Sequence, residues 1–347
     1  MKRIGPDRRV IKIARALGLD AEHNAVEQII DYCLRSIGSW PGIEKIATIT
    51  ELEILACKRL DLEFEEIHAN EDIERLVRKY AAQGEFGFAT IRSGFDKETF
   101  GTTYTRLNVT SGMSKRYVAF IDCRGEKSHR RFFTRWHEIA HLLTNPPKVG
   151  QPVNRSTIAR CPVEQLMDKI AGIVGFYDPI FRRALYRHAH ESLTLEQVEA
   201  IRATYCPVAS FQATLIACIQ RVDEPAIYVE VGIGYKKAEG EKVYSNQMSF
   251  LPDDLPESKL RVLQASPNIA ARTARIRIDP HMEVPAGSLI ARLFSSDCAT
   301  PTIFSSSGVE SLSIWKHSDG SDLGTMDVWI AAKRVGSRIL AIVKPYG

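Results

Sequence analysis

Residues 130–143 read RRFFTRWHEIAHLL, and this stretch decides how the first half of the chain folds. Its apolar residues recur at the spacing of one helical face: Phe133, Trp136, Ala140 and Leu143. The stretch is therefore predicted to be a helix with one buried side. His137 and His141 are four positions apart, so both imidazoles project from one side of this helix, one turn apart. That spacing lets a single tetrahedral zinc ion take one nitrogen from each ring.

Three acidic residues complete the chemistry that the two histidines suggest. Glu138 stands beside the metal, where a carboxylate can take a proton from zinc-bound water. A catalytic zinc needs a third protein ligand and one open position, and we assign that ligand to Glu164 on the next predicted helix, which opens at Pro162. Asp168 lies one turn further along the same face. It is predicted to accept the free ring N–H of one histidine ligand and to fix the orientation of that ring.

Cys161 can also reach the metal. It stands three residues before Glu164, at the start of the same helix, so its sulfur approaches the zinc if the preceding loop folds inward. We therefore consider Cys161 as a reversible fourth ligand that holds the site latent. The alternative is a small buried residue at the helix start, as is usual for a free cysteine.

The composition describes a globular chain with reduced cysteines. Its 347 residues allow two or three domains, and 44% apolar residues are enough to bury their cores. No apolar run approaches the length of a bilayer span, which argues against a membrane protein. The seven cysteines form no CxxC pair, which fits a reducing cytoplasm and excludes a zinc ribbon. The net charge of +4 permits a nucleic-acid partner without requiring one.

The pattern along the chain predicts an α+β fold in four regions. Residues 1–40 are expected to be a basic helical segment, with Asp20 as the N-cap of its second helix. Residues 41–180 form a mixed α/β, zincin-like metallopeptidase domain. The elements expected there are a helix with a Thr50–Glu53 capping box, strands at 62–68, 86–91 and 117–123, and helices at 70–83, at 130–143 and from 162.

The second half changes from helices to strands. Residues 181–224 are predicted to be a helical extension similar to a helix-turn-helix, and residues 225–347 a strand-rich, GAF-like regulatory domain. The strands expected in this last region are 226–232, 260–265, 274–278, 289–294, 312–316, 327–333 and 338–343, with a polar turn at 305–308.

Two of these elements have alternative interpretations. The helices at 195–204 and 210–219 form either a helix-turn-helix or a support for the catalytic domain. The second helix carries no Arg or Lys before Arg221, which disfavours contacts with DNA phosphates. The strand at 117–122 is either an edge strand that pairs with a substrate backbone or an internal strand with both sides paired.

Several of these stretches together resemble the ImmA/IrrE metallopeptidases, over about residues 41–222. They are the strand at 117–122, the run from Arg130 to His141, Val163-Glu164, and Asp168-Lys169-Ile170-Ala171. The resemblance implies that His137, His141 and Glu164 bind zinc and that Glu138 is the base. Two features depart from the family pattern: Trp136 stands where a small residue is commoner, and residues 175–179 replace the usual Leu-Leu-Met-Pro ending.

The same resemblance implies a function. Members of this family typically cleave a helix-turn-helix repressor encoded beside them, and a strand-rich or GAF-like sensor domain often follows the peptidase. We therefore expect a cytoplasmic zinc endopeptidase that cleaves such a repressor and derepresses a stress or phage-defence operon. Residues 225–347 are expected to gate it in response to single-stranded DNA or a small ligand. The alternative is a DNA-binding or scaffold regulator whose zinc site is structural or vestigial.

Overall fold

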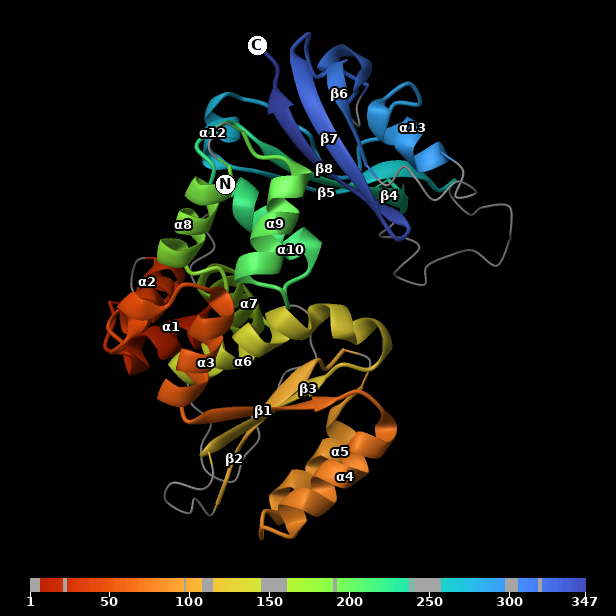
Figure 1. Ribbon diagram of the computed structural model, residues 1–347. Coiled ribbons are helices and arrows are strands. Elements are labelled where there is room, and N and C mark those ends of the chain that lie inside the picture. The colour runs from red at the N-terminus through yellow and green to blue at the C-terminus, as the bar shows by residue number, and fades with distance from the viewer. Residues whose placement is uncertain are drawn as a thin grey trace. The chain divides into compact units, whose positions relative to one another are not determined.

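The structure is a computed structural model that describes residues 7–20, 24–96, 98–107, 115–144, 161–189, 192–236, 239, 257–296, 305–317 and 320–347. The chain divides into two compact units (Figure 1). The first comprises Met1–Ala184 and Arg202–Ser210, and the second comprises Leu185–Ile201 and Phe211–Gly347. The class is α+β, with a three-stranded sheet in the first unit and a five-stranded antiparallel sheet in the second. Of the helices in the described ranges, none has both the length and the apolar character that crossing a bilayer requires.

The first unit contains most of the helices. They are α1 (Arg8–Ala16), α2 (Ala25–Gly38), α3 (Ile49–Arg59), α4 (Asn70–Ala81), α5 (Ile91–Gly94), α6 (Arg131–Thr144) and α7 (Pro162–Val174), with the 3₁₀ helices η1 (Ile43–Lys45), η2 (Phe86–Thr90) and η3 (Gly125–Arg130). Helices α8 (Asp178–His188) and α9 (Leu195–Tyr205) each run across a boundary between the units. Both α1 and α2 contact α7, so the N-terminal helices pack directly on one of the two helices that carry the predicted site.

Two predicted helix starts are wrong. Helix α2 begins after Asn24 rather than after Asp20. The capping box of α3 pairs Thr48 with Glu51: the Thr48 hydroxyl accepts the Glu51 N–H at 3.1 Å, and the Glu51 carboxylate accepts the Thr48 N–H at 3.1 Å. The sequence carries the same Thr-x-x-Glu pattern twice, two residues apart, and the earlier copy adds half a turn to the helix.

The sheet of the first unit has the order β1-β3-β2. Strand β3 (Tyr117–Asp122) pairs in parallel with β1 (Leu62–Ile67) and antiparallel with β2 (Gly101–Thr105). The strand at 117–122 is therefore internal, and the interpretation that it is a free edge is wrong. The edge strand on its antiparallel side is β2, which the sequence analysis did not predict.

Side chains alternate between the two faces of this sheet, which α6 covers on one side and α4 with α5 on the other (Figure 1). On the α4 face, Phe120 of β3 joins an aromatic cluster with Tyr80 and Tyr104. Phe88 belongs to the same cluster, its ring centroid 4.6 Å from that of Tyr80. The strand predicted at 86–91 is therefore wrong: Phe88 is buried from the short helix η2 rather than from a strand, and Phe86 of the same helix is exposed.

Helices α6 and α7 pack closely because a glycine lies opposite a tryptophan. Trp136 of α6 is completely buried, and Gly175 is the C-cap of α7. A Cβ atom at position 175 would lie 2.9 Å from Cδ1 and Cγ of Trp136 and 2.7 Å from the Ala171 carbonyl oxygen. A large residue on α6 is thus matched by the smallest residue at the end of α7.

The second unit is built on a sheet of order β5-β4-β8-β7-β6. Its elements are α10 (Phe211–Ile219), β4 (Ile227–Gly234), β5 (Lys259–Pro267), α12 (Ile269–Thr273), α13 (Leu289–Ser295), β6 (Ser305–Ser311), η5 (Leu312–Ile314), β7 (Asp327–Val335) and β8 (Arg338–Pro345). The predictions for β4, β5, β7 and β8 are confirmed. Strand β6 replaces the predicted polar turn at 305–308.

Three strands predicted for the second unit are wrong. Residues 274–278 lie after α12 outside any strand, 289–294 belong to α13, and 312–316 begin with η5. Helix α13 has a clear start, because the Ser288 hydroxyl accepts the Ala291 N–H at 3.1 Å. Leu289 and Ile290 are buried side chains of this helix. A short run of apolar residues does not by itself distinguish a buried helix from a strand.

Gly175→Ala is expected to destabilise the protein by about 1–3 kcal/mol, because the added methyl overlaps Trp136 and the end of α7. The matched control is Gly172→Ala in the same helix, where a Cβ meets nothing within 4 Å. That substitution should stabilise by about 0.4–1 kcal/mol. Urea unfolding of both variants measures the difference. Equal stabilities would show that the close approach of the two helices does not depend on Gly175.

Candidate metal centre

The chemical groups predicted from the sequence lie on two neighbouring helices. Helix α6 is buried nearly all round, and every residue from Trp136 to Thr144 is buried. It presents His137 and His141 one turn apart, as their spacing requires. Helix α7 starts with Pro162 at its first position, where a backbone N–H would have no partner within the helix, so the lack of one in proline costs nothing. Glu164 lies in the first turn of this helix. Contacts between α6 and α7 bring these side chains together.

Three electron-pair donors converge between the helices. Nε2 of His137 lies 3.1 Å from Nε2 of His141 and 3.1 Å from Oε2 of Glu164. Nε2 of His141 lies 3.6 Å from the same carboxylate oxygen. A tetrahedral zinc ion with bonds of about 2.0–2.1 Å holds its ligand atoms about 3.3 Å apart. The three separations therefore match the edges of a zinc coordination tetrahedron, and the group can hold a metal ion.

Asp168 fixes the proton on one of the rings. Its Oδ1 lies 2.7 Å from Nδ1 of His137, so Nδ1 carries the hydrogen and donates to the carboxylate. The lone pair of Nε2 then points at the other two donors. This is the arrangement in which a carboxylate orients and strengthens a histidine ligand.

The protonation states of the other two donors also favour a cation. Burial alone would raise the pKa of Glu164, but the two imidazole rings that face its carboxylate outweigh this effect and hold that pKa well below its usual range. Burial lowers the pKa of His141, which favours the neutral ring. A carboxylate anion and two imidazole lone pairs facing one another in a buried space form the donor set that zinc binds.

Glu138 contacts the sheet through strand β2. It is completely buried, and its Oε2 accepts a hydrogen bond of 2.7 Å from the Thr103 hydroxyl on β2. Gly101 makes room for it, because a Cβ atom there would lie 3.1 Å from the other carboxylate oxygen, Oε1, and 2.7 Å from Cγ2 of Thr134. The sequence analysis missed both β2 residues. The only available signal was the β-branched and aromatic run Thr102-Thr103-Tyr104.

Cys161 lies apart from the three donors. Its sulfur is not in the group of ligand atoms that fall within 4.8 Å of one another. It accepts a hydrogen bond of 3.4 Å from the guanidinium of Arg9, on α1, and its carbonyl accepts the Gln165 N–H at 3.0 Å as the N-cap of α7. Zinc ligation by Cys161 stays a prediction that requires the sulfur to move.

Comparisons with known proteins assign no family. No protein-family model matches the chain, and no curated protein matches it in sequence. Among solved structures, a Mycobacterium tuberculosis transcriptional regulator is similar over 97% of this chain and 80% of that chain, with 9% sequence identity and a TM-score of 0.41.

Removing a zinc ligand is expected to weaken zinc binding more than removing Asp168, which only orients a ligand. His137→Ala and Glu164→Ala each remove a donor atom and should abolish stoichiometric zinc binding. Asp168→Ala leaves all three donors and should weaken zinc by about ten- to a hundredfold. Competition with a chromophoric chelator measures the affinities. Gln165→Ala, an exposed change on the same helix, is the control and should bind zinc like the unmodified protein. Equal affinities in all the variants would rule out this donor set.

Proposed function

We propose that this chain is a zinc-dependent endopeptidase. The observation that carries the proposal is the buried convergence of His137, His141 and Glu164 beside a buried glutamate on the same helix. A structural zinc site has no use for a second buried carboxylate on the helix that carries the histidines, such as Glu138. This favours a catalytic site over the alternative of a regulator with a structural or vestigial metal.

Zinc bound by these three residues would polarise a peptide carbonyl and lower the pKa of a bound water molecule. Glu138 would act as the general base and then as the general acid, its carboxylate accepting a proton and passing it to the leaving amine. Thr103 donates a hydrogen bond to Oε2 of Glu138 and so orients the carboxylate that would exchange the proton. Asp168 keeps the His137 ring in the orientation and tautomer that the donor set needs. The buried surroundings of Glu138 strengthen its interactions with any charge that develops nearby.

Strand β2 is the element that we propose to bind the substrate. It is the edge strand of the sheet β1-β3-β2, and its residue Thr103 contacts the proposed base. An extended peptide can add to such an edge by main-chain hydrogen bonds, which would place its backbone beside Glu138. The strand at 117–122 was the candidate for this role from the sequence, but both of its sides pair with other strands.

The substrate, the signal and the compartment are proposals that rest on the resemblance to the ImmA/IrrE metallopeptidases. The substrate is a helix-turn-helix repressor encoded beside this chain, whose cleavage derepresses a stress or phage-defence operon in the cytoplasm. The strand-rich residues 225–347 gate the cleavage in response to single-stranded DNA or a small ligand. In the second unit, α10 packs against β4, and its buried residues include Thr214 and Leu215. This packing supports a structural role for α10 rather than the reading of DNA.

Glu138→Gln is expected to reduce cleavage of the neighbouring repressor by at least about a hundredfold while zinc remains bound, because the base is lost and the ligands are kept. Mass spectrometry of the repressor digest and metal analysis of the same sample provide the two readouts. Glu126→Gln, at an exposed position on η3, is the control and should cleave normally. Cleavage by Glu138→Gln at the rate of the unmodified enzyme would contradict the proposal.

Thr103→Val is expected to lower kcat/KM by about ten- to a hundredfold with zinc retained, because the hydrogen bond to the Glu138 carboxylate is lost. Thr103→Ser keeps the hydroxyl and should restore most of the activity, which a purely structural role of the methyl group would not. Thr102→Val, on the opposite face of β2, is the control for buried threonines on this strand. The positioning role fails if the valine variant at 103 is as active as the serine variant.

A further inference from the structure

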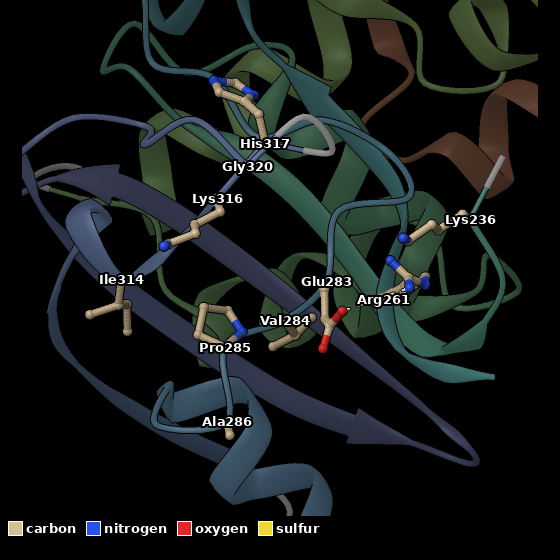
Figure 2. Close-up of a pocket in the computed structure, with 10 residues that line it drawn as sticks. All are labelled: Lys236, Arg261, Glu283, Val284, Pro285, Ala286, Ile314, Lys316, His317 and Gly320. Carbon is tan, nitrogen blue, oxygen red and sulfur yellow. Dashed lines mark ion pairs between the residues drawn. The ribbon is translucent and has the colours of Figure 1, made fainter. Parts of the chain in front are cut away.

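The second unit contains a pocket that the proposed peptidase chemistry does not use. It has a volume of about 310 Å³, at the lower end of the range for small-molecule sites. Its walls come from Lys236 just after the end of β4, the start of β5, residues 283–286, and residues 314, 316, 317 and 320, all within the second unit. Figure 2 shows Lys236 and Arg261 on one side of this pocket, Lys316 and Ile314 on the other, and Val284 with Pro285 between them.

Arg261 is a buried cation with hydrogen-bonding capacity left over. The residue is only 3% exposed, although it lines the pocket. Its Nη1 donates to the His281 carbonyl at 3.0 Å, which fixes the guanidinium. Its Nε has no hydrogen-bond acceptor among the described residues, and its Nη2 reaches Glu283 only at an ion-pair distance of 3.7 Å. The Nε atom is itself buried, and guanidinium N–H groups that lack a full set of acceptors are the donors with which arginine binds an oxyanion.

The backbone around Arg261 is held in place. The Val262 N–H donates to the Met282 carbonyl at 2.9 Å, and the Val262 carbonyl accepts the His281 N–H at 2.7 Å. The Val284 N–H donates to the Leu260 carbonyl at 2.9 Å. An oxyanion that binds Arg261 therefore meets a guanidinium already held in place rather than a side chain that must first be ordered.

The charges around the pocket favour an anion. Arg261, Lys236 and Lys316 supply three positive charges, against one carboxylate, Glu283. Glu283 also lies 3.5 Å from Lys259, outside the pocket lining, so it keeps a cationic partner when an anion occupies Arg261. Three cations around one site suit a doubly charged phosphate better than a singly charged carboxylate.

The rest of the wall is apolar. Val284, Pro285, Ala286 and Ile314 line the pocket together with the basic residues. Such a wall binds the non-polar part of a small molecule, and the polar groups fix its orientation. We propose that this pocket binds a small molecule that carries a phosphate group on an apolar body, with the phosphate beside the guanidinium of Arg261. This inference does not rest on the proposed peptidase function.

Isothermal titration calorimetry of the full chain with phenyl phosphate tests the proposal, with phenol and inorganic phosphate as the two halves of the probe. Phenyl phosphate should bind with one site per chain and at least about tenfold more tightly than either half. Arg261→Gln removes the guanidinium and should weaken phenyl phosphate by at least about tenfold. Lys316 is exposed, so Lys316→Ala leaves no cavity in the core and should not affect folding. This variant should bind phenyl phosphate about two- to fivefold more weakly.

Arg292→Ala is the control, because Arg292 is an exposed cation of the same unit that does not line the pocket. It should bind phenyl phosphate like the unmodified chain. The proposal is overturned if phenyl phosphate binds no better than phenol, or if the Arg261 and Lys316 variants bind it as well as the Arg292 control does. It is also overturned if a single-stranded oligothymidylate binds in a manner sensitive to Arg261 while phenyl phosphate does not, since the pocket would then serve a nucleic-acid backbone.

Discussion

The close packing of Trp136 against Gly175 sets the separation of α6 and α7, and the candidate site depends on that separation. The histidines and Glu164 belong to different helices, so their donor atoms converge only if the helix axes approach to within side-chain reach. A fully buried indole and a glycine without a side chain provide that approach. Protein interiors are packed tightly enough for one extra methyl group at such a point to be felt.

A second constraint is the burial of charge. Helix α6 lies in the core on nearly every side, yet it carries two histidines and a glutamate within five residues. An ionised carboxylate in such a place costs several kcal/mol unless it is paired or hydrogen-bonded. Glu138 is satisfied in part by the sheet through Thr103, and His137 by Asp168. The helix therefore carries both the contact with the edge strand β2 and the two histidines of the candidate metal site.

The sequence was sufficient for the helices of the site and insufficient for its sheet. The helical period of α6 and the proline that opens α7 are local signals, and the spacing of His137 and His141 determines which side of the helix they share. The pairing of β2 with β3 is not local, and the short run around Thr103 has no apolar alternation that would have marked it as a strand. The same limit explains the missed strand β6, whose serines and glycine read as a turn.

The central claim is that two imidazoles and one carboxylate hold the metal. X-ray absorption spectroscopy at the zinc edge of the zinc-loaded full chain tests it most directly. The account predicts nitrogen and oxygen scatterers at about 2.0–2.2 Å and the outer-shell scattering of two imidazole rings. A spectrum without two imidazoles, or a chain that retains no zinc after dialysis, would contradict the claim.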